Sequence, residues 1–175
     1  VGGWRAGDIL VGATTSAAIG DVELHGEAAS FSGVMKAVAG GSYRVPIGHG
    51  LLTYAEYHYS GYGAASPDQM LKQLRDPAFL VRYLRGDTQI LGRHALAAIA
   101  TYERSPEVTL SGQWLLSPAD GSGVLVPAVT YTPSDRWSVV INGYVPHGRA
   151  PVGAVLGSEF GASPLGLYVE LRVYR

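Results

Sequence analysis

The sequence predicts an all-β protein, an antiparallel transmembrane β-barrel with about eight to ten strands visible. Hydrophobic residues make up 47% of its 175 residues, yet charged residues make up only 15%, against about 25% in an ordinary soluble domain. No apolar run reaches the length of about 18 residues that a transmembrane helix needs. Apolar and polar residues instead alternate with a period of two, as in barrel strands.

Nine segments show this alternation and predict nine strands. The clearest is the last, where Leu167, Val169, Leu171 and Val173 alternate with polar or aromatic residues. Most run to about 10 or 11 residues, longer than the usual soluble strand of about five or six and long enough for a tilted transmembrane strand. The predicted strands are 7–17, 21–31, 34–45, 50–61, 89–103, 107–117, 123–132, 136–146 and 165–174.

The connections alternate in length, as expected for short periplasmic turns and longer external loops. The short ones lie at 18–20, 46–49, 104–106 and 133–135. At the other end the long external loops are 62–88 and 147–164. The connection at 117–122 is intermediate in length. The connection at 32–33 is tight and fits this alternation least well. No linker divides the chain, so 1–175 is predicted to be a single barrel domain.

The β pattern stops inside the 62–88 loop. Ser66 is a candidate N-cap, and Pro67 occupies the first helical position, where proline is favoured. A second helical segment follows Pro77. We expect one or two short helices in the external loop or folded into the barrel mouth.

The strand count itself raises a question. Nine strands with an inward C-terminal strand place the N-terminus outside, whereas bacterial single-chain barrels normally have an even number of strands. Either one strand is miscounted or 1–175 is the C-terminal part of a larger barrel, and we favour the larger barrel. The first four residues are interpreted as an external loop entering a strand.

One face of the predicted strands carries charges of both signs and is predicted to face the lumen. Since isolated buried charges are costly, pairs such as Glu27 with Lys36 and Arg44 with Glu56 are expected. The main interpretation is a polar ladder filling a narrow barrel; a pore lining or ligand site is the alternative. The polar residues of this face are Glu23, His25, Glu27, Lys36, Arg44, Glu56, His58, Arg93, Glu103, Glu170 and Arg172.

The uncharged face is predicted to meet lipid, since Lys or Arg at the bilayer midplane costs about 2–4 kcal/mol. Aromatic residues near the strand ends of this face suit a membrane-interface girdle; the alternative is the aromatic core of a soluble sandwich. The predicted girdle residues are Tyr57, Tyr59, Tyr102, Trp114, Tyr131 and Trp137.

One short motif could carry chemistry. In His58-Tyr59-Ser60, His and Ser share a strand face with Glu56, and a serine nucleophile needs such a base and acid. The motif resembles that of outer-membrane lipid A deacylases, although Gly61 stands where an Asn is expected and His58 is predicted to face inward. We therefore predict no catalytic residues and keep a lipid-modifying barrel enzyme as the alternative.

No cofactor or metal site is predicted. The chain has no cysteine, and its five histidines show no metal-ligand spacing. The net charge of -1 excludes the basic footprint of a nucleic-acid binder.

The segment Tyr54-Ala55-Glu56-Tyr57-His58-Tyr59-Ser60-Gly61-Tyr62-Gly63 resembles uncharacterised, porin-like outer-membrane barrel proteins of Gram-negative bacteria. The resemblance continues through 91–94, 158–161 and 171–174. It implies an outer-membrane location and a barrel fold, and brings no catalytic residues.

We therefore predict a non-enzymatic, integral outer-membrane β-barrel, either a porin-like channel or a scaffold in an envelope complex. Its partners would be outer-membrane lipid, lipopolysaccharide and, for a scaffold, other envelope proteins. Besides the lipid-modifying enzyme, a soluble lipocalin-like or β-sandwich binding protein remains an alternative.

Overall fold

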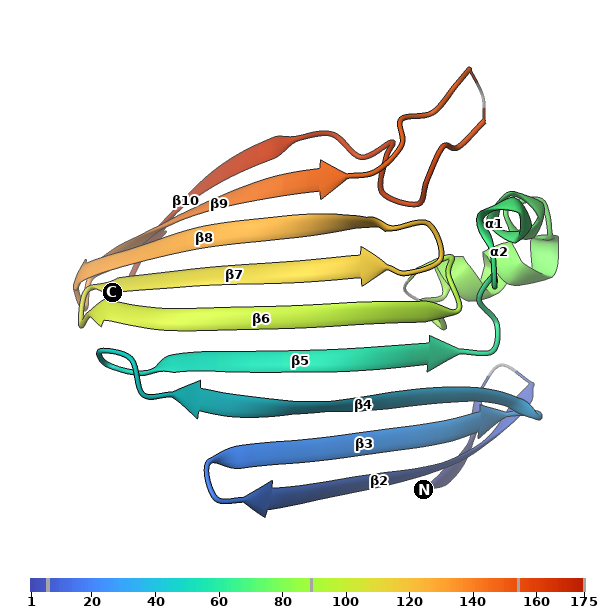
Figure 1. The fold of residues 1–175 in the computed structure, drawn as a ribbon, viewed down its shortest axis with the longest axis horizontal. Coiled ribbons are helices and arrows are strands. Elements are labelled where there is room, and N and C mark those ends of the chain that lie inside the picture. Colours follow the sequence, from blue (N-terminus) through green and yellow to red (C-terminus); the bar gives the residue numbers. More distant parts are fainter. Residues whose placement is uncertain (6, 89, 154, 175) are drawn as a thin grey trace.

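The computed structural model describes residues 1–5, 7–88, 90–153 and 155–174. Within these residues the chain is all-β: ten antiparallel strands form one curved sheet, and each strand pairs with the next along the chain (Figure 1). The strands are β1 (Gly2–Arg5), β2 (Asp8–Ile19), β3 (Val22–Phe31), β4 (Val34–Val45), β5 (Leu51–Ser60), β6 (His94–Ser105), β7 (Val108–Ser117), β8 (Ser122–Ser134), β9 (Trp137–His147) and β10 (Gly166–Val173).

Two short helices, α1 (Pro67–Gln73) and α2 (Pro77–Leu84), lie in the β5–β6 connection, as predicted. Both carry proline in the first turn. Ser66 is the N-cap of α1 but makes no side-chain cap hydrogen bond. Asp76 caps α2 by accepting a hydrogen bond from Ala78 N–H at 2.9 Å. Neither helix, nor any other in the residues described, is long and apolar enough to cross a membrane.

The nine predicted strands correspond to β2–β10, with two differences. The prediction missed β1, which pairs with the first four residues of β2 and brings the count to ten. The predicted strand 89–103 begins only at His94, because Gly92 makes an isolated bridge to Ala64 and its N–H, like that of Leu91, is bonded to Glu159. The hydrogen bonds to β5 therefore continue only as far as Arg93, whose carbonyl oxygen accepts from the Ser60 N–H at 2.8 Å.

The predicted all-β antiparallel architecture with a short helical segment is confirmed, but the described strands form an open sheet that is not closed into a barrel. Among the residues described, β1 pairs only with β2 and β10 only with β9. These strands form the two edges of the sheet, so the hydrogen bonds that would close a ring are absent from the strand order. The predicted alternation of connections is present with one exception: both long connections lie at one end of the sheet, but the two-residue turn at 32–33 between β3 and β4 lies at that end as well (Figure 1).

The few buried hydrophobic side chains lie mainly at the long-connection end. Met70 of α1 and Phe79 of α2 form a small cluster with Ala64 and Leu91 of the same β5–β6 connection. The sheet is a single layer, and no second sheet packs on it within the described ranges. Many large apolar side chains of the strands are consequently exposed, including Val169 at 67% and Leu171 at 65%.

Candidate functional site

The strand register separates the polar and apolar residues onto two faces. In one row, Glu23 pairs with Ser42 and Ser42 with Tyr54; in the adjacent row, Leu24 pairs with Gly41 and Gly41 with Ala55. All ten strand members among the predicted lumen residues, His25 included, share the first face, here called the polar face. They are Glu23, His25, Glu27, Lys36, Arg44, Glu56, His58, Glu103, Glu170 and Arg172. That this face lines a lumen stays a prediction.

The six predicted girdle aromatics share the opposite face, here called the apolar face. Tyr102, Tyr131 and Trp137 lie toward the tight-turn end, where the rings of Tyr131 and Trp137 meet edge to face at 6.0 Å. Tyr57, Tyr59 and Trp114 lie toward the long-connection end.

Two of the three aromatic residues at the long-connection end, Tyr57 and Trp114, have a histidine partner for their polar tip. The Tyr57 hydroxyl lies 2.6 Å from His94 Nδ1. Trp114 Nε1 donates to His147 Nε2 at 3.2 Å. This is the behaviour of amphipathic rings with an apolar body and a hydrogen-bonding tip.

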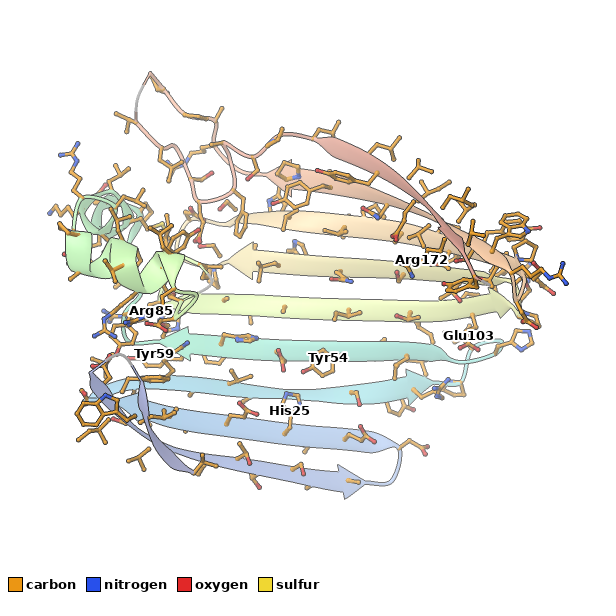
Figure 2. All side chains as sticks on the ribbon, turned by 180° about the vertical axis from the view of Figure 1, so that it is seen from behind. His25, Tyr54, Tyr59, Arg85, Glu103 and Arg172 are labelled. Atoms are coloured by element: carbon orange, nitrogen blue, oxygen red, sulfur yellow. The ribbon has the colours of Figure 1, made fainter. Side chains whose placement is uncertain are left out.

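A hydrogen-bonded cluster occupies the centre of the polar face. Glu56 is its hub: His25 Nε2 lies 2.8 Å from Oε1, His58 Nε2 lies 2.8 Å from Oε2, and the Tyr54 hydroxyl also bonds to Oε1. The rings of His25 and Tyr54 stack at a centroid distance of 5.5 Å, and Figure 2 shows them on β3 and β5 in the middle of the sheet. The carboxylate is thereby held by three side-chain groups.

Gly40 on the intervening β4 makes room for this cluster. A Cβ atom there would lie 2.5 Å from the Ala55 carbonyl oxygen, 2.6 Å from Glu56 Cγ and 2.9 Å from His25 Cε1. Strand alternation in the sequence predicts that His25, Glu56 and His58 share one face, but it does not predict the link between them. Their register across Gly40, which no local pattern encodes, creates it.

The two expected ion pairs have different outcomes. Glu27 pairs in register with Val38, two residues from Lys36, and the Glu27–Lys36 pair stays a prediction. Lys36 Nζ donates to the Asp87 carbonyl oxygen at 2.6 Å. Arg44 pairs in register with Leu52, four residues from Glu56 along β5, so the expected Arg44–Glu56 pair is wrong. On the edge strand β10, Arg172 and Glu170 form an exposed ion pair at 2.9 Å.

The β5–β6 connection folds over the end of the polar face. Arg82 of α2 donates to the Asp8 carboxylate at 2.8 Å and stacks over the Tyr62 ring at 4.5 Å. The hydrogen bond with Asp8 raises the pKa of Arg82 above its ordinary value. Together with the Lys36 contact, these interactions hold the helical connection against β2 and β4.

Glu159 ties the β9–β10 connection to the β5–β6 connection. Its carboxylate accepts the N–H groups of Leu91 at 2.5 Å and Gly92 at 3.3 Å. Burial raises the pKa of the Glu159 carboxyl above its usual range, although these hydrogen bonds lower it in part. Motifs that are 67 residues apart in the chain, at 91–94 and 158–161, thus meet at one contact.

Asp120, in the β7–β8 turn, completes this junction. It accepts hydrogen bonds from the Ser122 hydroxyl at 2.7 Å and from the Glu159 N–H at 2.7 Å. Burial opposes its ionisation, but these bonds outweigh it and hold the pKa of Asp120 below its ordinary value. The three connections therefore form one hydrogen-bonded network, which sequence analysis missed because its members are distant in the chain.

The catalytic alternative finds only part of its machinery. Glu56 orients His58, but the hydroxyl oxygen of Ser60 is buried without a hydrogen-bond partner. All three residues lie on the polar face, opposite the face predicted to meet lipid. Among the residues described, no group of three or more acidic, histidine or cysteine side chains is arranged to hold a metal ion.

Comparisons with family models, with curated proteins and with solved structures find no match for this chain. The resemblance to uncharacterised outer-membrane barrel proteins therefore stays an expectation. The features of the structure that bear on function are the two faces of the sheet and the network at its long-connection end.

Proposed function

We propose that the ten strands form a curved section of the wall of a β-barrel in the outer membrane of a Gram-negative bacterium. The apolar face would contact lipid and lipopolysaccharide, and the polar face would contact the lumen. The observation that carries this proposal is the single layer: large apolar side chains cover one face, and no other part of the described chain packs against them. In water such a surface would be an association site.

The length of the apolar face supports a membrane-spanning role. On β2 it runs from Ile9 to Ile19, and on β9 from Trp137 to His147. Each is a distance of ten residues, or about 34 Å at about 3.4 Å per residue. A strand tilt of about 40° reduces this to about 26 Å, close to the apolar band of about 25 Å in outer-membrane barrels.

The arrangement of aromatic residues also agrees with the proposal. Tyr and Trp gather toward both ends of the apolar face, and small or aliphatic residues fill its centre. Aromatic rings favour the two membrane interfaces, and the hydrocarbon layer favours aliphatic side chains. A soluble sandwich would instead bury the aromatic residues between two layers.

The function in this wall would be non-enzymatic, as a porin-like channel or as a scaffold that holds other envelope proteins. The experiment is to fold the protein in detergent micelles and in liposomes and to compare its gel migration before and after heating. Compact unheated migration and resistance to extraction from liposomes would support the proposal. A monomer that stays in solution without detergent and does not associate with liposomes would contradict it.

Conductance across a planar bilayer then separates the two roles. Discrete steps of conductance would support the channel, and their absence in a protein that does insert would support the scaffold. The enzyme alternative has its own test: a change in lipid A acylation on expression of the protein that disappears in Ser60→Ala would favour the enzyme.

A further inference from the structure

A pocket lies on the polar face, beside the point where the β5–β6 connection folds over the sheet. Its volume is about 450 Å³, within the range of about 300–1,000 Å³ typical of small-molecule sites. Strands β4, β5 and β6 form its floor, and residues of the connection form its side. Its polar lining residues are Lys36, Glu56, His58, Ser60, Thr88 and Arg93.

Two cations line this pocket. Lys36 Nζ donates to a backbone carbonyl, that of Asp87, at 2.6 Å. Arg93 Nε donates to the Gly63 carbonyl oxygen at 3.3 Å, and in the part of the chain that the structure describes Arg93 makes no ion pair. Because a carbonyl oxygen carries no formal charge, the guanidinium charge of Arg93 stays available to a ligand.

The single carboxylate in the lining is already engaged. Both oxygens of Glu56 accept hydrogen bonds within its cluster, from Tyr54, His25 and His58. The hydroxyl oxygen of Ser60, by contrast, is buried and has no partner in the described structure. An unsatisfied buried hydroxyl costs about 1–3 kcal/mol, so a rotation of the Ser60 side chain that brings its hydroxyl to a ligand in the pocket would recover this free energy.

We propose that this pocket binds a phosphate group, either free or carried by a small polar solute. A phosphate offers several acceptor oxygens, which suits an ammonium, a guanidinium and a hydroxyl converging from three segments of the chain. The site needs only residues of this chain, so it can be tested whether or not the protein conducts ions. In a channel it would favour the passage of phosphorylated solutes near the long-connection end.

The experiment is calorimetric titration of the folded protein in detergent micelles with inorganic phosphate at low ionic strength. The variants are Lys36→Gln and Arg93→Gln. The matched control is Arg44→Gln, which removes the same charge from the same face and strand as Lys36, eight residues away. Saturable binding that weakens about tenfold or more in both pocket variants, and not in the control, is the expected result.

Two further variants keep the test decisive if Lys36→Gln or Arg93→Gln folds poorly. Lys36→Arg retains the charge and should restore binding, and Ser60→Ala should weaken it without removing any charge. Acetate and methyl phosphate are titrated as probes of the ligand chemistry. Methyl phosphate should bind like phosphate.

The absence of saturable phosphate binding to the unaltered protein would overturn the proposal. Equal losses in Arg44→Gln and the pocket variants would also overturn it, because the effect would then be one of overall charge. Acetate binding as tight as phosphate binding would contradict the assignment to phosphate. Failure of membrane insertion is a separate readout, so the two proposals can fail independently.

Discussion

Ala97 and Ala98 are neighbours on β6. They are the same residue and both are half-buried, yet they face different surroundings. Ala97 pairs with Glu56 and belongs to the polar face. Ala98 lies between Ala55 and Trp114 on the apolar face. The difference between them teaches that position along the strand, and not residue type, decides the environment of each side chain in this sheet.

The largest expected difference in stability is between a lysine placed at Ala98 and a lysine placed at Ala97. Ala98→Lys should destabilise the lipid-inserted protein by about 2–4 kcal/mol, because an ammonium near the bilayer midplane loses its hydration. Ala97→Lys should have a much smaller effect, because its side chain would lie beside Glu56 on the polar face. Urea unfolding in liposomes measures both; equal losses would contradict the separation of the faces.

A smaller difference is expected between two glycines of the sheet. Gly40→Ala should destabilise the protein by about 1–3 kcal/mol, since the new Cβ overlaps packed atoms of the Glu56 cluster. Gly112→Ala should be nearly neutral or slightly stabilising, because a Cβ there has no atom within 4 Å and alanine reduces the freedom of the unfolded chain. Thermal unfolding in detergent tests this. The same loss in both variants would mean that packing around Gly40 is not responsible.

The smallest effect concerns the hydrogen-bonded network at the long-connection end. The pKa of Glu159 is raised in the folded state by burial, so its contribution to stability is fully present below its ordinary pKa of 4.5 and is lost as the pH rises through the raised value. Amide exchange at Leu91 and Gly92, corrected for intrinsic rates, should therefore be more protected near pH 4.5 than near neutral pH.

Asp120 sets the lower end of the pH range in which the network is stable. Its pKa is lowered, so its contribution is present above its ordinary value of 3.8 and is lost as the pH falls through the lowered value. In Glu159→Gln the dependence between pH 4.5 and neutral pH should disappear. If it persists in that variant, another group controls the junction.

The two faces could be predicted from the sequence because strand alternation is a local property. The residues assigned to the polar face and to the girdle take those faces in the register, and Pro67 and Pro77 correctly marked the helices. The four-residue β1 was missed because Gly2 and Gly3 give it no apolar alternation.

The contacts of Glu159 could not be predicted in this way. They depend on which distant segments meet, as when Glu159 reaches Leu91 across 68 residues of chain. The Glu56 cluster is intermediate: its members were assigned to one face, but their spacing across Gly40 depends on the register of three strands.

The central claim is that the apolar face contacts lipid and the polar face contacts water. Since the chain has no cysteine, single cysteines at Val139, Val140, Ile141 and Asn142 of β9 can each carry a spin label in liposomes. Labels at 139 and 141 should collide mainly with oxygen dissolved in the bilayer, and labels at 140 and 142 with a water-soluble nickel complex. Accessibility that does not alternate between these positions would contradict the claim.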